Sequence, residues 1–99
     1  MNDKALQTWY ANAQRIALEQ YDDHTSRFAA LTLIEYSYDI KRRLEPMYSE
    51  AKAWFRDYDK PGMSLEMVCE LLYMNVRDVQ RRCKLMDDSL SESEGRRAA

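Results

Sequence analysis

The chain has 99 residues, of which 45% are hydrophobic and 32% charged, and its formal net charge is −2. This length suffices for one domain with one core but not for two, and two Gly and two Pro are too few for the hairpins of an all-β protein. We therefore expect an all-α fold with about five helices in one compact domain. No apolar run reaches the roughly 18 residues of a membrane-spanning helix, and the N-terminal stretch MNDKALQTWY lacks the apolar segment of a signal peptide. The expected location is the cytoplasm, with no membrane contact.

The first predicted helix runs from about Asp3 to Tyr21. Asn2 or Asp3 is suited to cap its N-terminus, and its apolar residues recur at steps of three and four, which places them on one face. The residues expected on that buried face are Leu6, Tyr10, Ala13, Ile16 and Ala17. The polar run at 22–26 ends this helix.

The second predicted helix begins at Thr25 or Ser26, either of which can cap it, and continues to about Leu44. Two adjacent stripes run along it, formed by Phe28, Leu31, Ile34 and Tyr38 and by Ala30, Leu33, Ser37, Ile40 and Leu44. Because the apolar arc is wide, we expect this helix to be central and to have neighbours on two sides.

Pro46 interrupts the helical pattern, since proline cannot donate to the carbonyl of residue i−4 and disfavours helical geometry at Glu45. The helix either ends there, with Pro46 in the first turn of a third helix to about Tyr58, or kinks into one bent rod. Both readings fit the sequence. The apolar residues expected to face inward in the third segment are Met47, Ala51, Trp54, Phe55 and Tyr58. A loop at 57–62 follows, in which Pro61-Gly62 suits a type II turn.

Residues 64–86 read SLEMVCELLYMNVRDVQRRCKLM. Ser64 and Asn75 each precede a helical pattern and are good caps, so we expect two short helices joined between Tyr73 and Asn75. The following residues 87–99 are polar and lack apolar periodicity, which predicts a disordered tail. The predicted domain therefore spans 1–86, with a helix-turn-helix at 64–86.

A helix-turn-helix requires two short helices that cross steeply and are locked by apolar side chains around a turn of about three residues. The residues at the positions of such a lock are Val68, Cys69, Leu72, Met74, Val79 and Cys83. Cys69 is small where the first helix meets the second, Met74 fills the turn, and Val79 faces back. The spacing of the apolar residues is that of the motif.

Once Val79 and Cys83 point inward, the rest of the second helix carries amide and basic side chains. The candidate DNA-binding residues are Ser64, Asn75, Val76, Arg77, Gln80, Arg81, Arg82 and Lys84. Asn and Gln pair with adenine, and Arg pairs with guanine. Ser64, at the positive N-terminus of the first helix, and Arg82 are placed to contact phosphate. The pattern predicts that helix 75–86 reads the major groove.

This pattern resembles the helix-turn-helix family of transcriptional regulators of bacteria and their phages. More loosely, Trp54-Phe55, a short acidic loop and the residues from Met63 to Leu72 resemble small phage-encoded proteins with the order Trp-Phe, loop, Phe-Ser-Phe-Glu, Ile-Cys and Leu-Gly. Neither resemblance extends into the N-terminal half. Two positions depart from the usual pattern: Tyr73 stands where Gly is common, at a cost of about 1 kcal/mol if its φ is positive, and Asn75-Val76 replaces a polar or Asp-Pro start.

We therefore expect a sequence-specific DNA-binding transcriptional regulator of bacterial or phage type. Its partner would be double-stranded DNA, and a homodimer through the first two helices would match paired half-sites. Three alternatives stay open. In the first, the apolar residues are only the core of a helical hairpin and the Arg residues are its solvated face. In the second, the chain is a protein-interaction module, such as a phage-encoded inhibitor or adaptor of a host protein, which its acidic balance and many aromatic residues suit. In the third, the motif is kept only as a scaffold and its DNA face contacts protein.

Metal-binding and catalytic patterns are not expected. Cys69 and Cys83 lack the closely spaced further ligands of a zinc site, and His24 lies in a polar turn without the partners of a catalytic base. The sequence also has no Gly-rich phosphate loop or nucleophile elbow. We therefore predict that the protein is not an enzyme and that it needs no cofactor.

Overall fold

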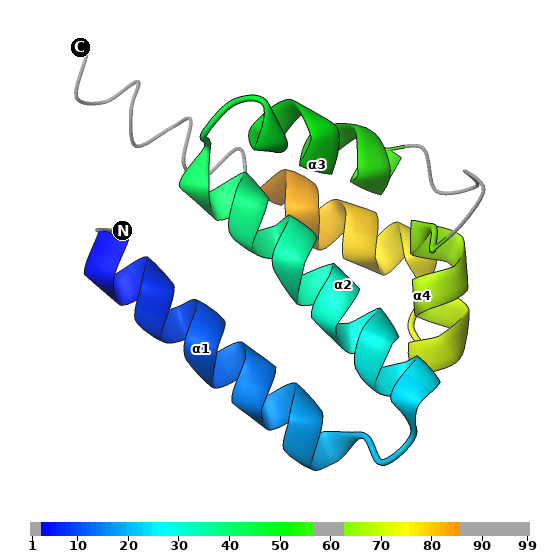
Figure 1. The fold of residues 1–99 in the computed structure, drawn as a ribbon. Coiled ribbons are helices and arrows are strands. Elements are labelled where there is room, and N and C mark those ends of the chain that lie inside the picture. Colours follow the sequence, from blue (N-terminus) through cyan, green and yellow to red (C-terminus); the bar gives the residue numbers. More distant parts are fainter. Residues whose placement is uncertain (1–2, 57–62, 86–99) are drawn as a thin grey trace, which may run out of the picture.

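The computed structural model describes residues 3–56 and 63–85. Within these ranges the chain forms five helices and no strand: α1 (Asp3–Gln20), α2 (His24–Arg42), α3 (Met47–Arg56), α4 (Leu65–Leu72) and a last helix over residues 76–85, here called helix 76–85 (Figure 1). The predicted all-α class is confirmed. The expected cap Asn2, the loop at 57–62 with its Pro61-Gly62 turn, and the tail 87–99 lie outside the described residues.

The helix α2 is the central element, as its wide apolar arc predicted. It packs against α1 on one side and against α3 and α4 on the other, and Figure 1 shows it running between α1 and α3. Its buried positions are Ala29, Ala30 and Ile40. Two of these three are alanines, so the first turns of α2 present small side chains to the core.

The helix α1 buries a narrower face than expected. Leu6 and Ala17 are buried and Tyr10 and Ala13 are half-buried, but Ile16 is 51% exposed. The prediction for Ile16 is wrong because α1 packs mainly on one neighbour, α2, so only a narrow stripe is covered. Ile16 lies about 100° around the helix from Ala17, outside that stripe.

The start of α2 also differs from the prediction. Asp23 is the N-cap, with φ −92° and ψ 150°, and its carboxylate accepts a hydrogen bond from the Ser26 backbone N–H at 2.8 Å. Thr25 and Ser26, the predicted caps, lie inside the helix. A carboxylate at this position satisfies a free backbone donor and also suits the positive end of the helix dipole, and this hydrogen bond lowers the pKa of Asp23.

Pro46 separates two helices and does not kink one. α2 ends at Arg42, and Arg43 adopts the left-handed conformation (φ 57°, ψ 31°) while its N–H donates to the Asp39 carbonyl. A cis peptide bond joins Glu45 to Pro46, and α3 begins at the next residue. Leu44, predicted to lie in the second helix, is outside it and exposed.

The core gathers around Trp54 of α3. Its ring stacks on Tyr36 with centroids 4.3 Å apart, and its indole Nε1 donates to the Met63 carbonyl at 2.9 Å. The other buried members of this core are Ala17, Ala29, Ala30, Ile40, Ala51, Phe55, Leu65, Val68, Cys69, Leu72 and Val79. Every helix therefore contributes to one apolar cluster.

In the described part of the chain, no helix has both the length and the hydropathy needed to cross a bilayer.

Candidate functional site

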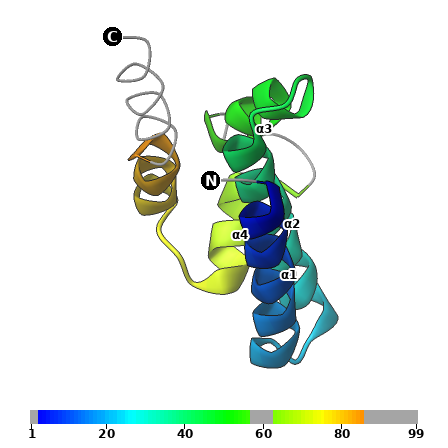
Figure 2. The same ribbon diagram turned by 90° about the vertical axis from the view of Figure 1, so that its left-hand side faces the viewer.

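A three-residue bend joins α4 to helix 76–85. Tyr73 adopts the left-handed conformation with φ 56° and ψ 43°, and its N–H points to the carbonyls of Cys69 and Glu70. The Met74 N–H donates to the Cys69 carbonyl at 2.8 Å. These bonds form a Schellman motif, which satisfies the last carbonyls of α4 and stops the helix. Helix 76–85 consequently does not continue the line of α4 but sets off in a new direction (Figures 1 and 2).

Both helices around the bend are capped by the residues that the sequence predicted. The Ser64 hydroxyl accepts from the Met67 backbone N–H at 3.2 Å at the start of α4. The Asn75 Oδ1 accepts from the Asp78 N–H at 3.1 Å, and the Asn75 carbonyl accepts from the Val79 N–H at 3.1 Å. Asn75 thus ends the bend and begins the next helix.

The left-handed conformation of Tyr73 costs conformational free energy, because a residue with a Cβ is unfavourable in that region. Its side chain is 97% exposed, so nothing in packing compensates. We expect Tyr73→Gly to raise the free energy of unfolding by about 0.5–1 kcal/mol, the relief of strain being partly offset by the entropy of glycine. Urea denaturation followed by circular dichroism measures this. Tyr73→Ala retains the Cβ and is the control; an equal gain in that variant would contradict the explanation.

One side of helix 76–85 packs on the body of the protein. Val79 is buried, while Met74, Val76 and Cys83 are half-buried against the core. The residues predicted to lock the two helices together, which are Val68, Cys69, Leu72, Met74, Val79 and Cys83, are all buried or half-buried. Burial also raises the pKa of the Cys69 thiol.

Gln80 fastens helix 76–85 to the end of α3. Its Nε2 donates to the Phe55 carbonyl at 2.9 Å and to the Arg56 carbonyl at 3.4 Å. These carbonyls belong to the last turn of α3, where backbone carbonyls have no partner within their own helix and accept from side chains instead. Gln80 was expected on or beside the outward face for base reading, but it is half-buried and its amide is engaged within the protein.

Removal of the Gln80 amide should loosen this attachment. We expect Gln80→Ala to lower the free energy of unfolding by about 1 kcal/mol, because two carbonyls lose their donor. Gln7→Ala is the matched control, since Gln7 is an exposed residue of α1. Chemical denaturation of both variants checks the difference, and equal stabilities would show that the bond contributes nothing.

Two further candidates for DNA contact are not on the surface that the sequence implied. Ser64 is buried, and its hydroxyl is used as the α4 cap, so it is not available to a phosphate. Val76 is half-buried and packs on the core. In both cases the outcome depends on neighbouring helices that local spacing does not reveal.

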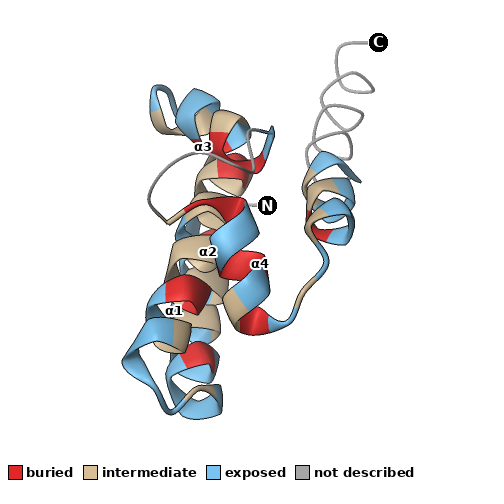
Figure 3. Cartoon of the chain, turned by 90° about the vertical axis from the view of Figure 1, so that its right-hand side faces the viewer, coloured by how far each residue is buried: buried red, intermediate tan, exposed pale blue. Residues whose placement is uncertain are grey.

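The remaining five candidates are exposed, namely Asn75, Arg77, Arg81, Arg82 and Lys84. Figure 3 shows exposed residues along the side of helix 76–85 that is turned away from the other helices. At about 100° per residue, Arg81 lies near the middle of that side, with Arg77 and Lys84 on one flank and Arg82 on the other. Four cations against the single anion Asp78 make this the basic face of an acidic protein.

The cations of the basic face make few contacts with the rest of the described chain. Arg81 Nη2 lies 3.5 Å from Asp78 Oδ1, but both side chains are well exposed, and such pairs contribute little. Among residues 3–56 and 63–85, Arg77, Arg82 and Lys84 make no hydrogen bond or ion pair. These side chains are therefore free to meet a ligand without first breaking a strong internal contact.

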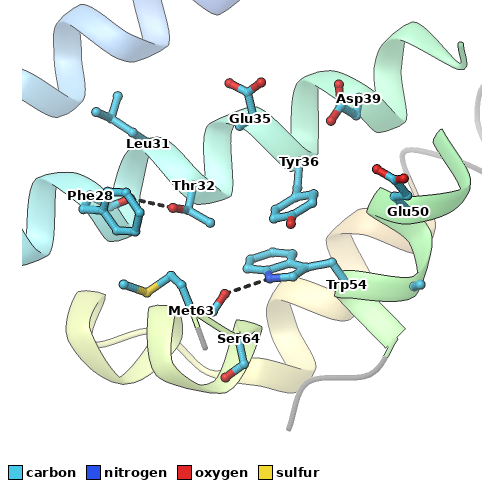
Figure 4. A pocket seen from close by; sticks show the side chains of 11 residues that line it. Phe28, Leu31, Thr32, Glu35, Tyr36, Asp39, Glu50, Trp54, Met63 and Ser64 are labelled. Atoms are coloured by element: carbon cyan, nitrogen blue, oxygen red, sulfur yellow. Dashed lines mark hydrogen bonds between the residues drawn. The ribbon is translucent and has the colours of Figure 1, made fainter. Parts of the chain in front are cut away.

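A second feature is a broad groove of about 910 Å³ between α2, α3 and the start of α4 (Figure 4). It is called the aromatic groove below, and it is lined by Phe28, Leu31, Thr32, Glu35, Tyr36, Asp39, Glu50, Ala53, Trp54, Met63 and Ser64. Phe28 was predicted to be core but is 57% exposed. Ala29 and Ala30 of the same turn are buried, so within the described ranges the turn is covered on their side and not on the side of Phe28.

The acids of the aromatic groove have different environments. The Tyr10 hydroxyl of α1 donates to Glu35, and this hydrogen bond is the main reason why the pKa of Tyr10 rises to about 12. Asp39 and Glu50 lie at the same end of the groove, on α2 and α3 respectively (Figure 4). Burial raises the pKa of Asp39, as do the negative charges of Glu35 and Glu50, against the opposing effect of Arg42.

Comparison with known proteins identifies no family: the chain matches no protein-family model, no curated protein and no solved structure. In the two described ranges, no three His, Cys, Asp or Glu side chains gather as potential metal ligands. The basic face and the aromatic groove are therefore the two surfaces that bear on function.

Proposed function

We propose that the chain is a sequence-specific DNA-binding transcriptional regulator of bacterial or phage type, and that α4 and helix 76–85 form a helix-turn-helix whose second helix enters the major groove. The observation that carries this proposal is the bend at Tyr73 to Asn75. It separates a buried, capped helix from one whose four cationic side chains all face solvent.

The dimensions and chemistry of helix 76–85 suit this role. The major groove of B-DNA is about 12 Å wide and admits one α-helix. Arg77 and Arg81 carry planar guanidinium groups that can pair with guanine, while Arg82 and Lys84 on the flanks are suited to phosphates. The net charge of −2 weakens such binding but does not exclude it, because attraction depends on the charges that face the duplex.

A homodimer through α1 and α2 belongs to the same proposal. Ile16 of α1 is 51% exposed, and an interface through α1 would cover it. Two copies related by a two-fold axis would read two half-sites about one helical turn apart. A palindrome in the bound DNA would be the corresponding signature.

Selection of duplexes from a random pool by the full-length chain tests the proposal. We expect one sequence to be enriched, and its affinity to fall steeply with salt, with a slope of about −3 per chain if three or four phosphates are neutralised. A shuffled duplex of equal length is the control. Failure to enrich any sequence, together with no salt-sensitive duplex binding, would reject DNA as the partner.

A protein-interaction module is the second candidate, and the aromatic groove is the observation that favours it. A module of this kind would show little duplex binding even at low salt, so the same titration separates the two functions.

A further inference from the structure

The aromatic groove has a surface that no proposed DNA contact uses. It lies on α2, α3 and the start of α4, whereas the basic face lies on helix 76–85. Tyr36 stacks on Trp54 at its middle, and Phe28 and Met63 lie toward the other end from Glu50 (Figure 4). A large exposed aromatic ring beside a stacked pair is typical of a protein-binding surface, where aromatic residues are enriched and supply most of the affinity.

The polar groups of the aromatic groove select the charge of its occupant. Asp39 and Glu50 stand together at one end, Glu35 lies nearby, and no basic residue is among the described residues that line it. The Tyr36 hydroxyl has no hydrogen-bond partner within the described ranges, so it is available to a ligand. A phosphate or an acidic peptide would be repelled here, while a guanidinium or ammonium group would be attracted both by the carboxylates and by the aromatic faces.

We propose that the aromatic groove binds a segment of another protein in which Arg or Lys stands next to apolar side chains. The cation would lie between Asp39 and Glu50, and the apolar side chains would cover Phe28 and the Tyr36–Trp54 stack. The carboxylates of the groove favour a cationic side chain of the partner. The exposed Phe28 ring is the place where the partner's apolar side chains pack. The proposal does not depend on DNA binding, because the two surfaces are on different helices.

The probe is a displayed library of random 12-residue peptides, selected against the full-length chain, with the enriched peptides then synthesised. The sequence contains two tryptophans, so Trp9→Phe leaves Trp54 as the only indole reporter of the groove. We expect enrichment of peptides with Arg or Lys beside apolar residues, and a change in Trp54 emission when they bind. Their affinity should fall with rising salt.

Matched substitutions locate the binding. Asp39→Asn with Glu50→Gln should weaken peptide affinity about three- to ten-fold, and Phe28→Ser should weaken it at least about five-fold. The controls are Glu66→Gln with Glu70→Gln, which remove two exposed carboxylates of α4, and Leu44→Ser, which removes an exposed apolar residue between α2 and α3. These controls should bind peptide as the unmodified chain does.

Several results would overturn the proposal. Enrichment of acidic peptides or of none would do so, as would binding that is indifferent to the groove substitutions. Self-association in sedimentation velocity that Phe28→Ser abolishes, without enrichment of any peptide, would assign the groove to contact between copies. Duplex binding measured on the same variants should be unchanged, so failure of this proposal is distinguishable from failure of the DNA proposal.

Discussion

Arg77→Ala with Arg81→Ala is expected to weaken binding of the selected duplex by about 2–4 kcal/mol, or roughly 30- to 1,000-fold. Both side chains are exposed on helix 76–85, and the only described contact of either is the weak pair between Arg81 and Asp78. Their loss should therefore remove contacts to DNA without disturbing the fold. Fluorescence anisotropy with a labelled duplex at fixed salt measures the effect.

Two comparisons separate base reading from simple attraction. Arg77→Lys with Arg81→Lys keeps the charge but loses the planar fork, so it should lose preference for the selected sequence while keeping most of the salt dependence. Arg15→Ala removes one exposed cation of α1 and should leave the affinity within about two-fold. Unchanged affinity in the double alanine variant would show that helix 76–85 is not the reading element.

The net charge of the chain conceals two surfaces of opposite character. The four cations of helix 76–85 lie on the exposed side of that helix, while Asp39 and Glu50 lie on α2 and α3. In a screened solution, charges more than about 8 Å apart act nearly independently at physiological salt. A net charge of −2 therefore excludes neither a polyanion at one surface nor a cationic peptide at the other.

Features governed by a few neighbouring residues were predictable from the sequence. Ser64 and Asn75 cap the helices that follow them because the capping bond spans only three residues. The left-handed Tyr73 follows from the need to end α4 before a second helix, even though the residue is not glycine. The break at Pro46 was visible, but whether it ended or kinked the helix depends on backbone geometry on both sides of it, which the residue pattern leaves undetermined.

Features governed by distant neighbours were not predictable in the same way. Gln80 turns inward because the end of α3 lies beside it, 25 residues away in sequence. Ile16 and Phe28 satisfy a helical period but are about half exposed, since they lie on a side of their helix that no described helix covers. Periodicity gives the direction of an apolar stripe and not how much of it is covered. The cations of the candidate site are therefore exposed as expected, whereas the Gln80 amide and the Ser64 hydroxyl are engaged within the protein.

Trp54→Ala is expected to lower the free energy of unfolding by about 3–5 kcal/mol, a large share of the 5–15 kcal/mol typical of a domain of this size. Trp54 is buried, and its ring stacks on Tyr36 and packs edge-on against Phe55, with the Trp54 and Phe55 ring centroids 5.0 Å apart. Its indole N–H donates to the Met63 carbonyl. Trp54→Phe retains most of the apolar contact but loses the donor and should cost less, while Trp9→Ala, at a half-buried position of α1, is the control for loss of an indole. Urea denaturation of the three variants measures these differences. A loss below about 1 kcal/mol for Trp54→Ala would mean that α3 and α4 do not depend on this residue for their packing, and that the aromatic groove is not held in place by it.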